Sequence, residues 1–440
     1  MDRYLKLGRA RELRTRPPVK EKMDFAIPEK TQKLLAELDA FIEDVIKPIE
    51  QEDDNIRFFD HRREDSRTDW DRNGLPNADW ENLLKRMRQE ADKAGFWRYQ
   101  LPSRFGGQDG NNLDMAIVRE HLARKGLGLH NDLQNESSIV GNLVTVLMME
   151  RFGSQKQQEY WIPRMLDGEA RIGFGLTEPL HGSDATWMET TAERDGDEWV
   201  ITGEKYWNTG LHHATHDYIF ARTSGEPGQG NGITCFIVPT DSPGFQVEEF
   251  MWTFNMPTDH AHVTLTQVRV SDEDILGEEG KGLQTAQLFV HENRIRQAAS
   301  SLGAGLHCID TAVDWARNRV VFGKPLAQNQ AIQFPLAELY TEAEMIRALI
   351  WKTAWQLDEG VDHMEITDKV AMCNYRGNRF CCDAADRAMQ TCGGQGYGRK
   401  LPFEHIYRHH RRYRITEGSE EIQIRKVAGK LFGFASRAKG

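Results

Sequence analysis

The chain has 440 residues, and its 56 lysines and arginines are outnumbered by 67 aspartates and glutamates, which gives a formal net charge of −11. Hydrophobic residues make up 39% of the chain, enough to fill the two or three cores expected at this length, so a disordered chain is excluded. The negative charge argues against a general nucleic-acid binder, because neutralising phosphates requires a basic surface. The apolar run at 143–149 is far shorter than the ~18 residues of a membrane span, so we expect a soluble protein.

The N-terminal segment and the cysteines bear on cellular location. Residues 1–28 begin with many basic residues but have no apolar core, so we do not expect a secretory signal. We interpret them as a flexible tail; the arginines leave a transit peptide open, but Asp2 and Glu12 argue against it. The six cysteines have no CxxC spacing, which is typical of reduced, intracellular thiols. We therefore expect a cytoplasmic protein, or one of the mitochondrial matrix if the source is eukaryotic.

Residues 29–170 are predicted to form an N-terminal helical domain. The segment 33–46 places Leu34, Leu38, Phe41 and Val45 on one helical stripe. The segment 53–77 is charged and poor in aliphatic residues, which predicts an insertion or a long loop.

Residues 171–282 are predicted to form a middle β domain. Short β-branched and aromatic runs alternate there with turn residues, and such closely spaced strands favour a small barrel or sandwich. The expected strands lie at 199–202, 218–223, 233–239, 245–250 and 262–270.

The helical period returns in residues 283–440. Apolar residues from Leu288 to Ala316 recur at intervals of three, four or seven, which predicts a long buried bundle helix, and 335–357 predict a second one. The order helices, strands, helices indicates an α+β chain of three domains rather than alternating βαβ units.

Several common catalytic and phosphate-binding motifs are missing from the sequence. There is no GxxxxGKS/T loop, no GxSxG and no HExxH, and the glycines at 394, 396 and 398 end in Arg399 where a dinucleotide motif needs another glycine. The histidines at 212, 213, 216, 260 and 262 have no recognisable ligand spacing. We expect them to be solvated loop residues, with no metal site.

Four unusual stretches remain. They are LTEPLHGSD at 176–184, WNT at 207–209, RVVFGKP at 319–325 followed by Gln330, and the C-terminal pair QTCGGQGY at 390–397 and TEGSEEIQ at 416–423. In this order and at these separations they resemble the acyl-CoA dehydrogenase family over residues 29–440. The resemblance implies an N-terminal helical domain, a middle β-barrel or sandwich, and a C-terminal four-helix bundle.

The resemblance also implies a reaction. Family members bind FAD between the β domain and the C-terminal helical domain, remove the α-proton of an acyl-CoA thioester, and pass the β-hydrogen as hydride to flavin N5, which leaves a 2-enoyl-CoA. The proton transfer needs a carboxylate base in a dry pocket, and Glu417 matches the family's catalytic glutamate. The alternative interpretation is a surface glutamate in a turn.

Other site residues are implied by the same motifs. The positions that match substrate contacts are Ser183, His291, Arg294, Thr416 and Gly418. The positions that match FAD contacts, some of them to the FAD of a neighbouring subunit, are Phe174, Leu176, Thr177, Ser183, Trp207, Thr209, Arg319, Phe322, Gln330, Gln390, Gly394, Ser419 and Glu421.

The sequence departs from the family pattern within or beside these positions, including Leu180 and His181, which replace a glycine and an alanine in the loop before Ser183. Asn208 replaces an isoleucine, His291 replaces an aspartate, and Thr416 replaces an aromatic residue that often narrows the acyl pocket. Because side chains alternate along a strand, Asn208 should point away from Trp207 and Thr209.

Partners and alternatives follow from the same resemblance. We expect an acyl-CoA substrate from fatty acid metabolism, an electron-transfer flavoprotein as electron acceptor, a homodimer or homotetramer, and neither nucleic acid nor membrane as a partner. The alternatives are a flavoenzyme of the same fold with desulfinase, nitroalkane oxidase or monooxygenase chemistry, and a DNA-associated member of the fold. The basic residues of 405–414 are either a positive field for a polyanionic ligand or a solvated helix face paired with acidic neighbours.

Overall fold

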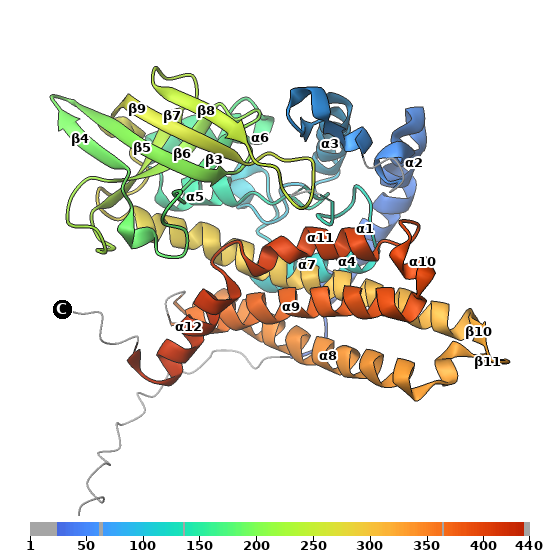
Figure 1. The fold of residues 1–440 in the computed structure, drawn as a ribbon. Helices are drawn as coiled ribbons and strands as arrows, with labels where there is room; N and C mark the ends of the chain where they lie inside the picture. The colour runs from blue at the N-terminus through green and yellow to red at the C-terminus, as the bar shows by residue number, and fades with distance from the viewer. Residues whose placement is uncertain (1–23, 61–64, 135–136, 363–364, 435–440) are drawn as a thin grey trace, which may run out of the picture.

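The computed structural model of the chain describes residues 24–60, 65–134, 137–362 and 365–434. It contains a helical N-terminal part, a β sheet and a helical C-terminal part, which confirms the predicted α+β fold class (Figure 1). Most of the tail predicted at 1–28 lies outside the described residues.

The N-terminal part packs its first helices around one apolar core, whereas its last two helices belong to a core that they share with the β sheet. Leu34, Leu38, Ile42 and Ile46 are buried in the first of these cores, as the helical stripe predicts. The helices are α1 (Glu29–Phe41), a π-helical turn η1 (Ile42–Ile46), α2 (Lys47–Gln51), α3 (Ala78–Lys93), α4 (Asn112–Arg124), α5 (Val144–Phe152) and α6 (Gln155–Asp167).

The segment 53–77 includes ordered structure among its described residues. Strand β1 (Thr68–Asp69) pairs with β2 (Leu75–Pro76), and the 3₁₀ turns η2 (Glu52–Phe58) and η4 (Trp70–Arg72) lie beside them. The four residues 61–64 lie outside the described part.

The middle part is one curled seven-stranded sheet. Its strand order is β3-β6-β4-β5-β9-β8, with β7 paired to β6, and each of the five predicted runs is a strand. The strands are β3 (Ile172–Gly175), β4 (Thr191–Asp195), β5 (Glu198–Asn208), β6 (His216–Arg222), β7 (Ile233–Pro239), β8 (Phe245–Phe250) and β9 (Ala261–Ser271).

The C-terminal part is built around α7 (Gly282–Asn318), which runs beneath the sheet and then along the other long helices (Figure 1). Its apolar side chains at the predicted positions, such as Leu302 and Leu306, are fully buried. A short hairpin of β10 (Val320–Val321) and β11 (Lys324–Pro325) follows it. The remaining helices are α8 (Gln330–Asp358), α9 (Thr367–Cys392), α10 (Gly394–Tyr397), α11 (Phe403–Arg411) and α12 (Glu420–Leu431).

Two further findings bear on the predicted class of protein. The six cysteines are buried and form no disulfide. Among the described residues, none of the helices combines the length and apolar character needed to cross a membrane.

Helices α4 and α7 approach each other closely where α7 has a glycine. A Cβ atom at Gly303 would overlap the carbonyl oxygen of Glu120 and would lie 2.8 Å from the Cβ of Ala123. The absence of a side chain at Gly303 therefore sets the distance between the N-terminal part and the bundle.

We predict that Gly303→Ala lowers the free energy of unfolding by about 1–3 kcal/mol, because the backbone of α4 has to move away. The matched control is Gly429→Ala in α12, where an added Cβ meets no atom within 4 Å. That substitution should be neutral or stabilising by up to about 1 kcal/mol, since alanine favours a helix. Urea unfolding measures both changes, and equal effects would contradict the assigned role of Gly303.

Candidate active site

The end of β5 and the turn after β3 form one surface of the site. The Tyr206 N–H donates to the Thr177 carbonyl at 2.9 Å and so joins the two segments. The register of β5 against β9 shifts between Tyr206 and Asn208, and Trp207 at this shift has a φ of 68°. Such a bulge redirects a side chain. The Trp207 ring is therefore 46% exposed, whereas Asn208 is fully buried and Thr209 is partly exposed.

A buried ion pair fixes the TEP turn (Thr177–Pro179), which follows β3, behind this surface. Glu178 accepts hydrogen bonds from the backbone N–H groups of Glu189 (2.7 Å) and Thr190 (2.9 Å), and it pairs with the Lys205 ammonium at 2.8 Å. Burial alone would raise the pKa of Glu178, but the Lys205 charge and the hydrogen bonds hold it below its usual value. Burial lowers the pKa of Lys205 to about 8. The pair holds Leu176 and Thr177 in place relative to β5.

Helix α7 connects this surface to Glu417. Phe289 of α7 stacks on Phe174 of β3, with ring centroids 3.9 Å apart. Arg294 lies about 7.5 Å further along the helix axis, and its Nε donates to the Glu417 carbonyl at 3.0 Å, with Nη2 bonded to the same oxygen. Burial lowers the pKa of Arg294 to about 10. The predicted flavin surface and the predicted base therefore lie beside neighbouring turns of one helix.

A hydrogen-bonded network holds the turn that contains Glu417. Glu417 and Gly418 both have positive φ values, 56° and 87°. Gln423 of α12 donates to the Gly418 carbonyl and to the Asn374 side chain, each at 2.8 Å. Asn374 of α9 in turn donates to the Arg294 carbonyl (3.0 Å) and to Gln297 (3.1 Å). Three helices thus fix a backbone conformation that a glutamate rarely adopts.

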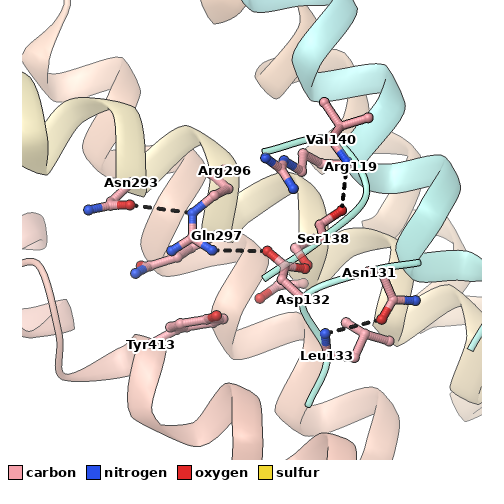
Figure 2. Close-up of polar contacts among 12 residues, drawn as sticks. Arg119, Asn131, Asp132, Leu133, Ser138, Val140, Asn293, Arg296, Gln297 and Tyr413 are labelled. Carbon is pink, nitrogen blue, oxygen red and sulfur yellow. Dashed lines mark hydrogen bonds and ion pairs between the residues drawn. The ribbon is translucent and has the colours of Figure 1, made fainter. Parts of the chain in front are cut away.

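The buried polar residues of this region were missed by the sequence analysis. Figure 2 shows Arg296 of α7 directed at Asp132, with 3.0 Å between Nη1 and Oδ2. Ser300 also donates to Asp132, and Gln297 lies on the same stretch of helix. The sequence does contain a sign of this buried polar cluster. Arginine, glutamine and serine interrupt the apolar period of α7 where the helix is buried on all sides.

The other predicted substrate residues, and two predicted FAD residues at the start of α12, occupy different environments. Thr416 precedes Glu417, and its hydroxyl oxygen is buried without a hydrogen-bond partner among the described residues. His291 is buried and contacts the Thr367 hydroxyl of α9 at 3.3 Å. Ser183 is exposed on the loop after the TEP turn. Ser419 is the N-cap of α12, and Glu421 is exposed in its first turn.

A second group of predicted FAD residues lies at the far end of α7. Arg319 ends the helix about 45 Å from Phe289, and Phe322 in the following hairpin is fully exposed with a φ of 47°. The β10–β11 hairpin and α10 lie towards the same end of the helical bundle in Figure 1. The exposed members of the group are Arg319, Phe322, Gln330, Gln390 and Gly394. Within one chain the structure does not bring them to Trp207.

The basic segment 405–414 is largely paired or buried. Arg408 pairs with Glu404 at 2.7 Å and Arg414 with Glu420 at 2.9 Å. His409 is fully buried, as are the histidines at 405 and 410. Acidic partners therefore balance the two arginines, whereas the histidines do not belong to a solvated face.

Two of the loop histidines are also less solvated than predicted. The His212 side chain is only 10% exposed, and burial lowers the pKa of His213 to about 3. With Glu81 they form a group whose ligand atoms lie within 4.8 Å of one another. Arg88 pairs with Glu81 there at 3.9 Å, and the buried Nδ1 of His212 has no hydrogen-bond partner in the described structure. Metal-bound histidines usually donate from the second ring nitrogen, so this arrangement does not favour a metal.

Known proteins resemble the chain along most of its length. Family profiles match for the acyl-CoA dehydrogenase N-terminal domain at residues 28–169, the middle domain at 173–268 and the C-terminal domain at 280–432. The 3-(aryl)acrylate reductase of Clostridium sporogenes is 32% identical over 79% of this chain and 89% of its own. The short-chain specific acyl-CoA dehydrogenase of human mitochondria is 32% identical over 77% of this chain and 80% of its own. The structure of butyryl-CoA dehydrogenase from Megasphaera elsdenii superposes with a TM-score of 0.76 at 26% identity, covering 93% of this chain and all of the other.

The buried ion pair yields a stability prediction. We expect Lys205→Met to lower the free energy of unfolding by about 3–5 kcal/mol, because it leaves the Glu178 carboxylate buried without its counter-charge. Arg269→Met is the matched control on the same sheet, since the exposed Arg269 pairs with Asp195 and Glu198 at the surface. Its effect should be much smaller. Denaturant unfolding of both variants checks this, and a Lys205 effect no larger than the control would contradict it.

Proposed function

Because the chain belongs to the acyl-CoA dehydrogenase family, we propose that it oxidises an acyl-CoA thioester to a 2-enoyl-CoA, with Glu417 as the base that takes the α-proton. The family is FAD-dependent, so the chain is a flavin-dependent oxidoreductase. One observation carries the choice of base. Arg294 binds the Glu417 backbone carbonyl and so keeps this residue beside α7. Phe289, which lies earlier on the same helix, stacks on Phe174 of β3, the strand before the TEP turn.

The residues of this surface fit a flavin. Trp207 offers an exposed aromatic face, Thr209 beside it offers a hydroxyl group, and Phe174 and Leu176 supply apolar contact. At the far end of α7, a Cβ atom added at Gly393 or Gly394 would meet no atom within 4 Å, so the backbone there is open to a phosphate chain. When bound, FAD supplies the acceptor for the hydride that leaves the β-carbon.

In the proposed reaction, residues of this chain accept the α-proton and orient the base. The Glu417 carboxylate accepts the α-proton, and the Arg294 guanidinium fixes the backbone carbonyl of the same residue. A base acts only if its carboxylate reaches the reacting carbon, so the network from Gln423 to Gln297 contributes by orientation. With FAD bound, the Thr209 hydroxyl would donate a hydrogen bond at the flavin edge, where negative charge develops.

We further propose that two copies of the chain share each FAD. The two groups of cofactor residues are about 45 Å apart along α7, farther than one FAD molecule reaches. A second copy would bring its own Arg319, Phe322 and Gln330 to the flavin surface of the first. This separation supports a homodimer or a homotetramer built from such dimers.

The physiological setting is also a proposal. An electron-transfer flavoprotein is the electron acceptor that the family resemblance suggests. The six unbridged cysteines support a reducing compartment such as the cytoplasm. The pairing of Arg408 and Arg414 with glutamates weighs against nucleic acid as a partner.

We predict that Glu417→Gln retains FAD, with its two visible absorption bands, but loses bleaching by acyl-CoA. The rate should fall by about 10²–10⁴-fold, because an amide does not accept the α-proton. Anaerobic stopped-flow absorbance measures the rate, and Glu359→Gln, at the partly exposed C-cap of α8, serves as the control. Unchanged bleaching in Glu417→Gln would assign the base to another residue.

The residue before the base yields a prediction about the acyl group. Thr416 has a small side chain and a buried hydroxyl oxygen, so we expect a roomy or polar acyl pocket. Initial rates of bleaching across a panel of straight, branched and polar acyl-CoAs should favour the bulky or polar members, and Thr416→Phe should shift the preference to short straight chains. Activity of the unsubstituted protein on short straight chains alone would contradict this.

A further inference from the structure

Directly behind the candidate flavin surface, two polar side chains meet inside the sheet. Asn208 of β5 and Asp217 of β6 are both fully buried, and the Asn208 Nδ2 donates to the Asp217 Oδ2 at 2.5 Å. The other two polar atoms, Asn208 Oδ1 and Asp217 Oδ1, are buried and have no hydrogen-bond partner in the described part of the chain. An ionised aspartate would leave both acceptors unsatisfied in a region closed to solvent, which is costly.

Strand β3 leaves space for this pair. An added Cβ at Gly173 would lie 2.8 Å from the Asp217 Oδ1, and one at Gly175 would lie 2.6 Å from the Asn208 Nδ2. Any larger residue at either position would collide with the pair. The two glycines of β3 therefore accommodate a carboxyl group and a carboxamide inside the sheet.

The charged and titratable groups around Asp217 do not neutralise a carboxylate. Lys205 of β5 is engaged by Glu178, and β3 carries no titratable residue. On β7, burial raises the pKa of the Cys235 thiol well above its usual value, and burial likewise raises that of the Tyr218 hydroxyl on β6. Burial raises the pKa of Asp217 itself to about 8, although the Asn208 hydrogen bond, the Lys205 charge and the Tyr218 backbone N–H act in the opposite direction.

We propose that Asp217 is a neutral carboxylic acid that pairs with the Asn208 carboxamide and thereby positions the flavin-facing segment 207–209. In this pair the Asp217 O–H donates to the Asn208 Oδ1 while the Asn208 N–H donates to the Asp217 Oδ2. Both buried acceptors are then satisfied, and no charge is buried in the sheet. Asp217 is a positioning residue, because it acts through Asn208.

The pair matters to the site because Asn208 lies between Trp207 and Thr209, so a displacement of its side chain moves both neighbours. Ionisation of Asp217 would remove the O–H donor and place a negative charge behind the flavin surface. That charge would disfavour negative charge on bound FAD and lower its reduction potential. The link to FAD rests on the proposed function, whereas the acid–amide pair does not.

The acid form has a signature in stability. The pKa of Asp217 is higher in the folded chain than in the unfolded one, so its contribution to stability is present at low pH and is lost as pH rises towards about 8. Asp217→Asn keeps the shape and both hydrogen bonds but does not ionise. We expect its melting temperature to fall less than that of the unsubstituted protein between about pH 6 and about pH 9. Lys205 titrates in the same range and its pKa responds to the Asp217 charge, so the melting temperatures report the two groups together and the infrared band assigns the acid form to Asp217.

The direct test is the infrared C=O band of a protonated carboxyl group, measured without FAD. The difference spectrum between the unsubstituted protein and Asp217→Asn should contain this band at about pH 6 and lose it above about pH 9. The control is Glu292→Gln, which removes a partly buried acid of α7 whose pKa is also raised by burial. The Asp217 band should persist in that variant. Absence of an Asp217 band at about pH 6 would overturn the proposal.

A second pair of variants keeps the test valid if Asp217→Asn does not fold. Asn208→Leu alone leaves the acid without its partner, whereas Asn208→Leu with Asp217→Leu removes both polar groups. The single variant should therefore have the lower melting temperature. An equal or higher melting temperature would contradict the pairing.

With FAD bound, the visible circular dichroism of the flavin should change between about pH 7 and about pH 9 in the unsubstituted protein but not in Asp217→Asn. If the carboxyl band is present but the circular dichroism of the two proteins changes alike, the positioning role of Asp217 is overturned. The acid–amide pair itself would still stand. Failure to bind FAD at all would refute the proposed function without affecting the infrared result.

Discussion

The arrangement of the molecule depends on the packing of a single helix of 37 residues, α7, against three different neighbours. Near the start of α7, Phe289 stacks on Phe174 of the sheet, and a few residues later Arg294 binds the Glu417 turn. Near the middle of the helix, the lack of a side chain at Gly303 allows α4 to pack closely. An α-helix is stiff over this length, so these contacts share one rigid frame. The relative placement of the flavin surface and the base therefore follows from residue spacing along α7. It does not depend on a flexible linker.

Much of the fold could be predicted because most elements have a clear hydrophobic period. The five expected strands and the two long helices α7 and α8 are present near the predicted residues. Helix α9 was not predicted, because alanines and cysteines form its buried face and give a weak apolar signal. The polar support of the Glu417 turn was also missed. Asn374 and Gln423 act through contacts between helices far apart in sequence, which no local pattern encodes.

Charge patterns were harder to interpret than apolar ones. The segment 405–414 has the composition of a solvated basic face, yet its three histidines are buried and two of its arginines pair with Glu404 and Glu420. His212 and His213, on a loop between strands, are likewise shielded by α3 through Glu81. In each case an element distant in sequence covers the side chain or supplies the partner. Sequence alone gives the charge of a segment but not the groups that face it.

The distance between the two cofactor groups on α7 has a thermodynamic consequence. If each FAD touches two copies of the chain, then cofactor binding and self-association are linked equilibria, and each strengthens the other by the same factor. Dilution would then release flavin, and removal of flavin would loosen the assembly. The length of α7 would in this way make the concentration of the protein a determinant of its cofactor content, because a lone subunit holds only part of each binding site.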